Sequence, residues 1–174
     1  MLNKNIILKN FDLKKRLNKK FKISKILKKV LSEDNQILKS LGPSYKDSYN
    51  KKIIKKLKKN SQFRLIGMGG SILGSKAIYN FLSPKGKQFS FIDNLSNEFE
   101  EINSKKMVNV IISKSGNTLE TISNSNIFIS KNQSNFFITE NKKSYLMNLA
   151  NKLKAEIIHH NNFIGGRYSV LSEV

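Results

Sequence analysis

The sequence predicts an α/β protein, a parallel-sheet αβα sandwich with a helical extension on its amino-terminal side. Two observations predict this class. Short apolar runs alternate with helical periodicity over residues 61–174, and lysines separate apolar residues at helical spacing over residues 1–60. With 39% hydrophobic residues, 174 residues are enough to build one core. We therefore expect an N-terminal helical extension over residues 1–60 and an α/β domain over residues 61–174.

The expected extension contains two helical patterns. Apolar residues recur at three- and four-residue intervals over residues 11–31 and again over residues 45–57. The Gly-Pro-Ser sequence at residues 42–44 lies between them and is typical of a break between helices. We therefore expect two helices joined by a turn.

The α/β domain contains five short apolar runs that predict strands. They are residues 63–67, 89–93, 107–113, 135–139 and 156–160. Segments with helical patterning separate most of these runs, which favours parallel β-α-β units with helices on both faces of one sheet. In such sheets, ligands bind beyond the carboxyl ends of the strands.

The charge of the chain is concentrated in the extension. The formal net charge is +20, and residues 1–60 hold 19 Lys or Arg against 4 acids. Because clustered lysines attract phosphate backbones, a basic nucleic-acid-binding protein is the alternative from a different functional class. Arg16 is the only arginine of this segment, whereas specific recognition of phosphates and bases favours arginine. We therefore expect solvated helix faces here, and no nucleic-acid partner.

Composition excludes several other classes of site. The chain has no cysteine, which excludes disulfides, zinc–thiolate sites and cysteine nucleophiles. No stretch approaches the ~18 apolar residues of a membrane span, and the apolar start of the chain is too short for a signal peptide. The expectation is a cytoplasmic protein without a membrane partner.

Glycines and hydroxyl residues follow three of the five expected strands. These clusters are residues 67–71, 113–118 and 165–169, behind the first, third and fifth strands. The carboxyl ends of parallel strands lie at one edge of a sheet, so one crevice can collect all three clusters.

The first cluster lies in the sequence "IGMGGSILGS". The dinucleotide-binding pattern does not fit it because position 72 is isoleucine, and the nucleoside-triphosphate pattern does not fit because Ser75 precedes Lys76. The glycines still allow a tight turn. We expect Ser71 to open a helix that runs to about Leu82, with amide groups and a hydroxyl that attract an anion.

The second cluster lies in "SKSGNTLET" and repeats this arrangement. It combines three hydroxyl groups with one positive charge, from Ser113, Lys114, Ser115 and Thr118. A plain helix cap by Asn117 or Thr118 is the alternative interpretation. Two such turns behind neighbouring parallel strands favour a phosphate monoester, whose three oxygens need several converging donors.

The strings "IGMGGSILGS", "ISKSGNTLET" and "GGRYSVLSEV", in this order and spacing, resemble the glucose-6-phosphate isomerase family. The resemblance covers residues 63–174, and the third string is the most specific. It implies the SIS (sugar isomerase) domain of that family, a parallel αβα sandwich.

The resemblance also implies an activity, the aldose–ketose isomerisation of glucose 6-phosphate and fructose 6-phosphate through an enediol, without metal or organic cofactor. It implies a substrate-binding role for six residues of the first two clusters: Gly70, Ser71, Ser113, Lys114, Ser115 and Thr118. Arg167 matches the catalytic arginine that stabilises the negative charge of the enediolate. A guanidinium suits this role because it does not lose its proton.

Family members continue beyond this motif into a second SIS domain and a carboxy-terminal region that carry the catalytic glutamate, histidine and lysine. We therefore expect the 174-residue chain to bind a hexose 6-phosphate weakly and not to catalyse alone, and the full-length form to be a homodimer. His159 and His160 are expected to be structural or at the edge of the crevice. Another SIS phosphosugar isomerase, or a phosphosugar-binding regulator, is the alternative within the same fold.

Overall fold

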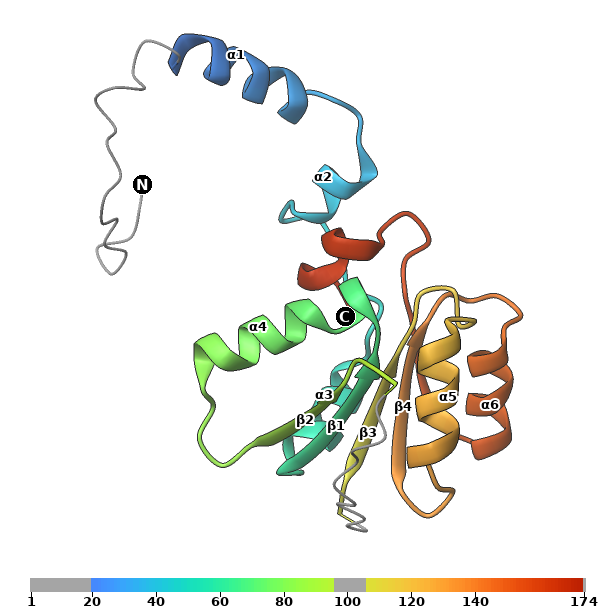
Figure 1. Ribbon diagram of the computed structural model, residues 1–174. Coiled ribbons are helices and arrows are strands. Elements are labelled where there is room, and N and C mark those ends of the chain that lie inside the picture. Colours follow the sequence, from blue (N-terminus) through green and yellow to red (C-terminus); the bar gives the residue numbers. More distant parts are fainter. Residues whose placement is uncertain (1–19, 96–105, 174) are drawn as a thin grey trace.

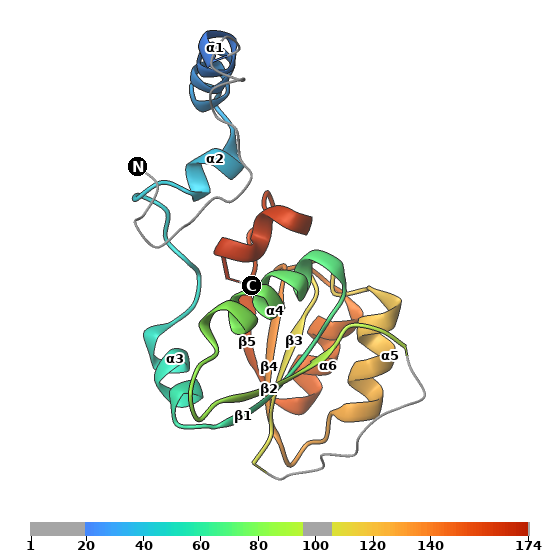
Figure 2. The same cartoon turned by 60° about the vertical axis from the view of Figure 1, so that its left-hand side comes forward.

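The computed structural model describes residues 20–95 and 106–173 (Figure 1). Helix α1 (Lys20–Leu31) confirms the carboxyl half of the first expected helix, whose earlier residues lie outside the described ones. The short helix α2 (Gln36–Ser40) follows it. In both ribbon views, α1 lies away from the α/β domain (Figures 1 and 2).

The second expected helix begins later than the periodicity indicates. Helix α3 is Lys51–Lys58, so the start predicted at Tyr45 is wrong by six residues. Asn50 determines the start, because its side chain accepts a hydrogen bond from the Lys52 backbone N–H at 2.9 Å. Tyr45 and Ser48 therefore lie in a connecting segment, where they make long-range contacts.

All five expected strands are present in one parallel sheet. They are β1 (Gln62–Gly67), β2 (Gln88–Ile92), β3 (Val108–Ile112), β4 (Ser134–Thr139) and β5 (Glu156–His159). The strand order is β2-β1-β3-β4-β5, and every neighbouring pair is parallel. The chain thus leaves β1 toward one edge and returns at β3 toward the other. Ligands of doubly wound sheets bind at this reversal, between the carboxyl ends of β1 and β3.

Helices cover both faces of the sheet, as the sequence predicts (Figure 1). The connections are α4 (Leu73–Leu82), α5 (Leu119–Phe128) and α6 (Tyr145–Leu153). Helix α4 lies on the face of β2 that carries Phe89, whose ring centroid is 5.0 Å from that of Tyr79. Helix α6 lies on the opposite face, where Leu146 and Ala150 pack with Phe137.

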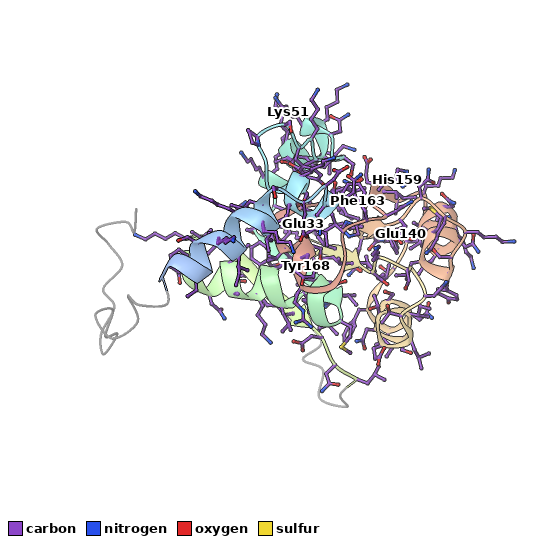
Figure 3. The ribbon with its side chains drawn as sticks, turned by 90° about the horizontal axis from the view of Figure 1, so that it is seen from above. Glu33, Lys51, Glu140, His159, Phe163 and Tyr168 are labelled. Carbon is purple, nitrogen blue, oxygen red and sulfur yellow. The ribbon has the colours of Figure 1, made fainter. Side chains whose placement is uncertain are left out.

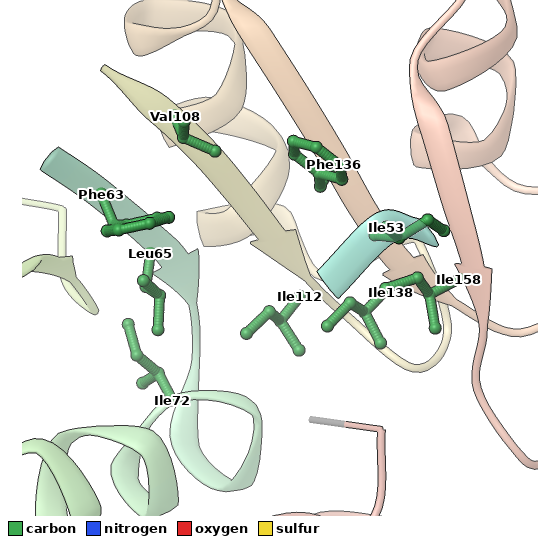
Figure 4. Close-up of a cluster of buried hydrophobic side chains, with 9 residues drawn as sticks. All are labelled: Ile53, Phe63, Leu65, Ile72, Val108, Ile112, Phe136, Ile138 and Ile158. Atoms are coloured by element: carbon green, nitrogen blue, oxygen red, sulfur yellow. The ribbon is translucent and has the colours of Figure 1, made fainter. Parts of the chain in front are cut away.

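Helix α3 completes the larger of two hydrophobic clusters (Figure 4). Its Ile53 is buried in this cluster, which also contains Ile72 and side chains of four strands; the buried members from the strands are Phe63, Leu65, Val108, Ile112, Phe136, Ile138 and Ile158. Most side chains on both faces are apolar because parallel strands are covered on both sides, although Arg64 and Asn109 are buried among them. Packing of Ile53 in this cluster joins α3 to the sheet.

The first glycine turn (residues 67–71) packs against the last turns of the chain, the short 3-10 helix Gly166–Leu171. A Cβ atom on Gly70 would lie 2.3 Å from the carbonyl carbon and oxygen of Gly166. One on Gly74, in α4, would lie 1.8 Å from Val170 Cγ2. The glycines are therefore required by the close approach of these segments.

Gly74→Ala tests this packing. Alanine inside a helix ordinarily stabilises it by ~1 kcal/mol relative to glycine, but here the methyl group overlaps Val170, and we expect a net loss of about 1–3 kcal/mol. Urea unfolding measures the change. Asn80→Ala, at an exposed position of the same helix, is the control and should not destabilise. A Gly74→Ala chain as stable as the control would contradict the packing.

Candidate functional site

Three turns gather at the carboxyl end of the sheet. They are the first glycine turn, the serine turn (residues 113–118) and the arginine turn (residues 165–173). Figure 3 looks down on this end of the molecule, with Glu140, Phe163 and Tyr168 labelled. The arginine turn touches the glycine turn through Gly166 and the serine turn through Gly165. The three clusters therefore lie next to one another, but the cavity beside Arg167 is lined by residues of the first and third clusters and not by the serine turn.

The first glycine turn differs from the prediction at Ser71. Residues Gly69–Ser71 form one turn of 3-10 helix, and α4 begins at Leu73 with Ile72 at its N-cap. Ser71 therefore does not open the helix. It lies inside the 3-10 turn that the hydrogen bond from the Ile72 N–H to the Gly69 carbonyl, at 3.1 Å, closes. Ser71 is half-buried, and Gly70 is held against the arginine turn.

The hydroxyl groups of the serine turn make hydrogen bonds within the turn itself. Ser113 is buried, and its Oγ lies 3.0 Å from Thr118 Oγ1. The Asn117 N–H donates to Ser115 Oγ at 3.2 Å. Gly116 has a φ of 66°, and a Cβ there would lie 2.2 Å from Ser144 Oγ, so both its conformation and its surroundings require glycine.

Helix α5 begins at this turn without a side-chain cap. Thr118 is the N-cap residue, as one of the two predicted candidates, but its side chain makes no capping hydrogen bond. The Asn117 Oδ1 instead accepts from the Tyr145 N–H at 2.9 Å. The plain-cap interpretation is therefore wrong for both side chains. Uncapped amide groups of the first turn, with the positive end of the helix dipole, attract anions.

Lys114 joins the serine turn to the segment that leads into the arginine turn. Its Nζ donates to the Asn162 carbonyl at 2.6 Å and lies 3.4 Å from Glu140 Oε1. Burial raises the pKa of Glu140, but hydrogen bonding and charge from Lys142 and Lys114 outweigh it, so the pKa lies below its ordinary value. The charge of Lys114 is thus shared with a buried carboxylate.

Arg167 is exposed on the 3-10 helix Gly166–Leu171. A cavity of about 540 Å³ is lined by Arg167 together with Gly70, Leu73, Gly74, Gly166 and Val170. Among residues 20–95 and 106–173, no ion-pair partner of Arg167 is present. Arg167 therefore lines this cavity, and no carboxylate of the described residues pairs with it. Among the described residues, no hydrogen bond or ion pair joins Arg167 or Ser71 to Ser113, and Ser113 does not line the cavity beside Arg167.

A polar cluster around the buried residues His160 and Glu173 adjoins the arginine turn, and sequence reasoning missed it. The Glu173 carboxylate accepts hydrogen bonds from the Tyr45 hydroxyl at 2.9 Å and from the Asn161 side chain and the Ser48 N–H at 3.3 Å each. His160 Nδ1 lies 3.1 Å from its second oxygen. His160 is buried, which agrees with its expected structural role, whereas His159 is exposed. We call these five residues, Tyr45, Ser48, His160, Asn161 and Glu173, the Glu173 cluster.

Hydrogen bonding keeps the Glu173 carboxylate charged. Burial raises the pKa of Glu173, but hydrogen bonds from its own backbone N–H, Tyr45, His160 and Ser48 outweigh it, so the pKa lies below its ordinary value. Burial also raises the pKa of Tyr45 to about 12, so this residue stays a donor. The described residues contain no group of three His, Cys, Asp or Glu arranged to hold a metal ion.

A sequence profile of the phosphoglucose isomerase family matches residues 49–174. The chain belongs to this family. Relatives include glucose-6-phosphate isomerases of Methanocaldococcus jannaschii, 36% identical over 123 residues, and of Borrelia garinii, 36% identical over 128 residues. Each alignment covers 63% of this chain, which spans 30% and 24% of the two relatives. The family match begins before residue 63 and includes α3, but not Tyr45 or Ser48.

Solved structures share the parallel α/β fold of this chain. Protein TT0462 of Thermus thermophilus superposes with a TM-score of 0.67 at 21% identity, over 91% of this chain and 45% of that one. The Vibrio vulnificus NanR protein, solved with ManNAc-6P, has a TM-score of 0.50 at 18% identity, over 69% and 47% of the two chains. Within residues 20–95 and 106–173, none of the helices has the length and apolar content needed to span a membrane.

The Glu173 carboxylate makes stability depend on pH. Because its pKa in the folded protein lies below the ordinary value of 4.5, its contribution is complete above that pH and is lost as the pH falls through the lower, folded value. We expect Glu173→Gln to destabilise the chain at about pH 7 and to cost less at about pH 3. Urea unfolding at both pH values measures the difference.

Glu156→Gln is the matched control for this prediction. Glu156 pairs with Lys56 at an exposed position on β5, where an ion pair contributes little. A Glu173→Gln penalty that is the same at both pH values, or no larger than that of the control, would contradict the charge assigned to Glu173.

Proposed function

We propose that this chain is the sugar-phosphate-binding part of a glucose-6-phosphate isomerase, the aldose–ketose isomerase that interconverts glucose 6-phosphate and fructose 6-phosphate. The uncapped start of α5 beside the Ser113–Thr118 hydroxyl pair carries the proposal. Amide and hydroxyl donors converge there, as a phosphate dianion requires. Family membership supports the choice of substrate over that of another phosphosugar isomerase or a phosphosugar-binding regulator.

In this proposal the serine turn binds the phosphate. Ser113, Ser115 and Thr118 supply hydroxyl donors, and the first amides of α5 add the field of the helix dipole. Lys114 contributes charge from the rim, attenuated by its pairing with Glu140. Gly70 and Ser71, in the first glycine turn, contact the other side of the sugar phosphate.

Arg167 is the catalytic residue of the proposal. Removal of a proton from carbon 1 or carbon 2 of the open-chain sugar leaves an enediolate with negative charge on oxygen. An exposed guanidinium at the cavity rim, without an ion-pair partner among the described residues, offers fixed positive charge to that oxygen. The proton transfer itself needs a base within hydrogen-bond reach, a role that we assign to no residue of this chain.

The proposal includes a cytoplasmic location and a homodimeric full-length enzyme. We propose both because the sequence resembles the glucose-6-phosphate isomerase family, whose reaction belongs to central metabolism. Neither changes the roles given to the serine turn and to Arg167.

Ser113→Ala tests the phosphate site. Loss of one hydrogen bond to a charged group costs about 1.5 kcal/mol or more, so we expect the affinity for fructose 6-phosphate to fall about tenfold. Isothermal titration calorimetry measures it. Ser134→Ala, at the opposite end of the sheet, is the control and should bind as the unaltered chain does. Equal affinity of the Ser113→Ala and Ser134→Ala chains would overturn the assignment.

The 174-residue chain should bind without turnover. We expect fructose 6-phosphate to bind while a coupled assay of glucose 6-phosphate formation gives no rate above that of a Ser113→Ala, Arg167→Ala double variant. Isomerisation by the purified chain above this background would show that it contains the catalytic base.

A further inference from the structure

We propose that Tyr45 and Glu173 are positioning residues that fix the arginine turn, so that Arg167 meets the sugar end of the ligand. The inference rests on the proposed function for the identity of that ligand. Tyr45 lies outside the family match, which begins at residue 49. A residue of the amino-terminal segment thus takes part in building the site.

The arginine turn is held at both of its ends. At its start, Gly165 lies against Lys114, where an added Cβ would be 3.1 Å from Nζ, and Gly166 lies against Gly70. At its other end, the Glu173 carboxylate receives its four polar contacts within the Glu173 cluster. Arg167 is between these two attachments. The direction of its side chain therefore depends on both.

The turn has little stability of its own. A 3-10 helix has poorer hydrogen-bond geometry than an α-helix and is seldom longer than three or four residues. Here, the Tyr168 N–H bonds to the Gly165 carbonyl at 3.3 Å, and the Ser172 N–H bonds to the Ser169 carbonyl at 3.0 Å. The Ser169 and Ser172 hydroxyls add local bonds to the Gly166 and Ser169 carbonyls. Because a 3-10 helix of six residues is longer than its geometry usually supports, contacts with the rest of the fold help to keep it in place.

Tyr45 is the central donor of the attachment at Glu173. Its hydroxyl donates to the carboxylate at 2.9 Å and accepts from the Asn161 side chain at 2.6 Å. Glu173 is 6% exposed, so water cannot readily replace a lost donor. The Ser48 hydroxyl also donates to the His159 carbonyl, which brings the same segment against the end of β5.

Tyr45→Phe in the full chain removes this hydroxyl and keeps the ring. We expect amide hydrogen exchange at Tyr168 and Ser172 to become about tenfold faster, since the turn loses one attachment. Exchange at Ser113, whose N–H bonds to the Ile138 carbonyl in the sheet, should not change. A general loss of stability would accelerate all three amides, which separates positioning from a merely structural role.

The second measurement is binding. The probe is 6-phosphogluconate, an open-chain sugar phosphate with a carboxylate at carbon 1 that can meet Arg167. We expect Tyr45→Phe and Glu173→Gln each to lower the affinity of the chain for 6-phosphogluconate about tenfold. Arg167→Ala should lower it as well. None of these substitutions should change the affinity for inorganic phosphate. Tyr79→Phe, on α4 far from the turn in sequence and bonded only weakly to the Lys87 carbonyl at 3.4 Å, is the control.

Three results would overturn the inference. Unchanged exchange at Tyr168 and Ser172 in the Tyr45→Phe chain would show that the turn does not depend on this hydroxyl. Faster exchange with unchanged affinity for 6-phosphogluconate would show that Arg167 needs no such support, and the proposed function would stand. If the unaltered chain binds neither probe, the proposed function fails and the inference fails with it.

Discussion

Close backbone contact between the first glycine turn and the arginine turn is the constraint on which the site depends. Gly70 approaches Gly166 so closely that a single methyl group would overlap the carbonyl group. Gly74, at the start of α4, approaches Val170 as closely, since an added Cβ there would overlap the Val170 side chain. This contact brings the carboxyl end of β1 to a segment near the end of the chain, and it gives the cavity beside Arg167 its walls. The glycines after β1 are therefore required first by the close packing of two segments of the protein, whether or not a ligand binds there.

The serine turn shows how a helix start can be kept available for an anion. Side chains that ordinarily cap a helix are engaged elsewhere, Thr118 with Ser113 and Asn117 with the Tyr145 backbone. The positive end of the α5 helix dipole therefore lies at the edge of the sheet. Neither of these two side chains accepts a hydrogen bond from the first backbone N–H groups of the helix. Together with the reversal of strand order between β1 and β3, this arrangement explains why the site forms where it does.

Sequence patterns predicted the strands well because a buried parallel strand is mostly apolar. Each of the five runs lies within two residues of its strand's bounds. Helix starts were predicted less well. Periodicity in the segment before α3 included Tyr45 and Tyr49, although Asn50 caps the helix, and Ser71 was assigned to α4 although it belongs to the preceding 3-10 turn. Apolar spacing reports which face is buried, whereas local hydrogen bonds decide where a helix begins.

The sequence by itself determined the α/β class, the five strands and the three clusters of glycine and hydroxyl residues behind them, because these depend on local composition and spacing. Only the tertiary structure decided that Glu173 meets Tyr45, 128 positions earlier, and that Lys114 reaches the approach to Arg167. No periodicity records such pairs, since a hydrogen bond between distant residues leaves no regular interval in the chain. They arise when the packing of the sheet and its helices brings polar groups out of water, where each must find a partner.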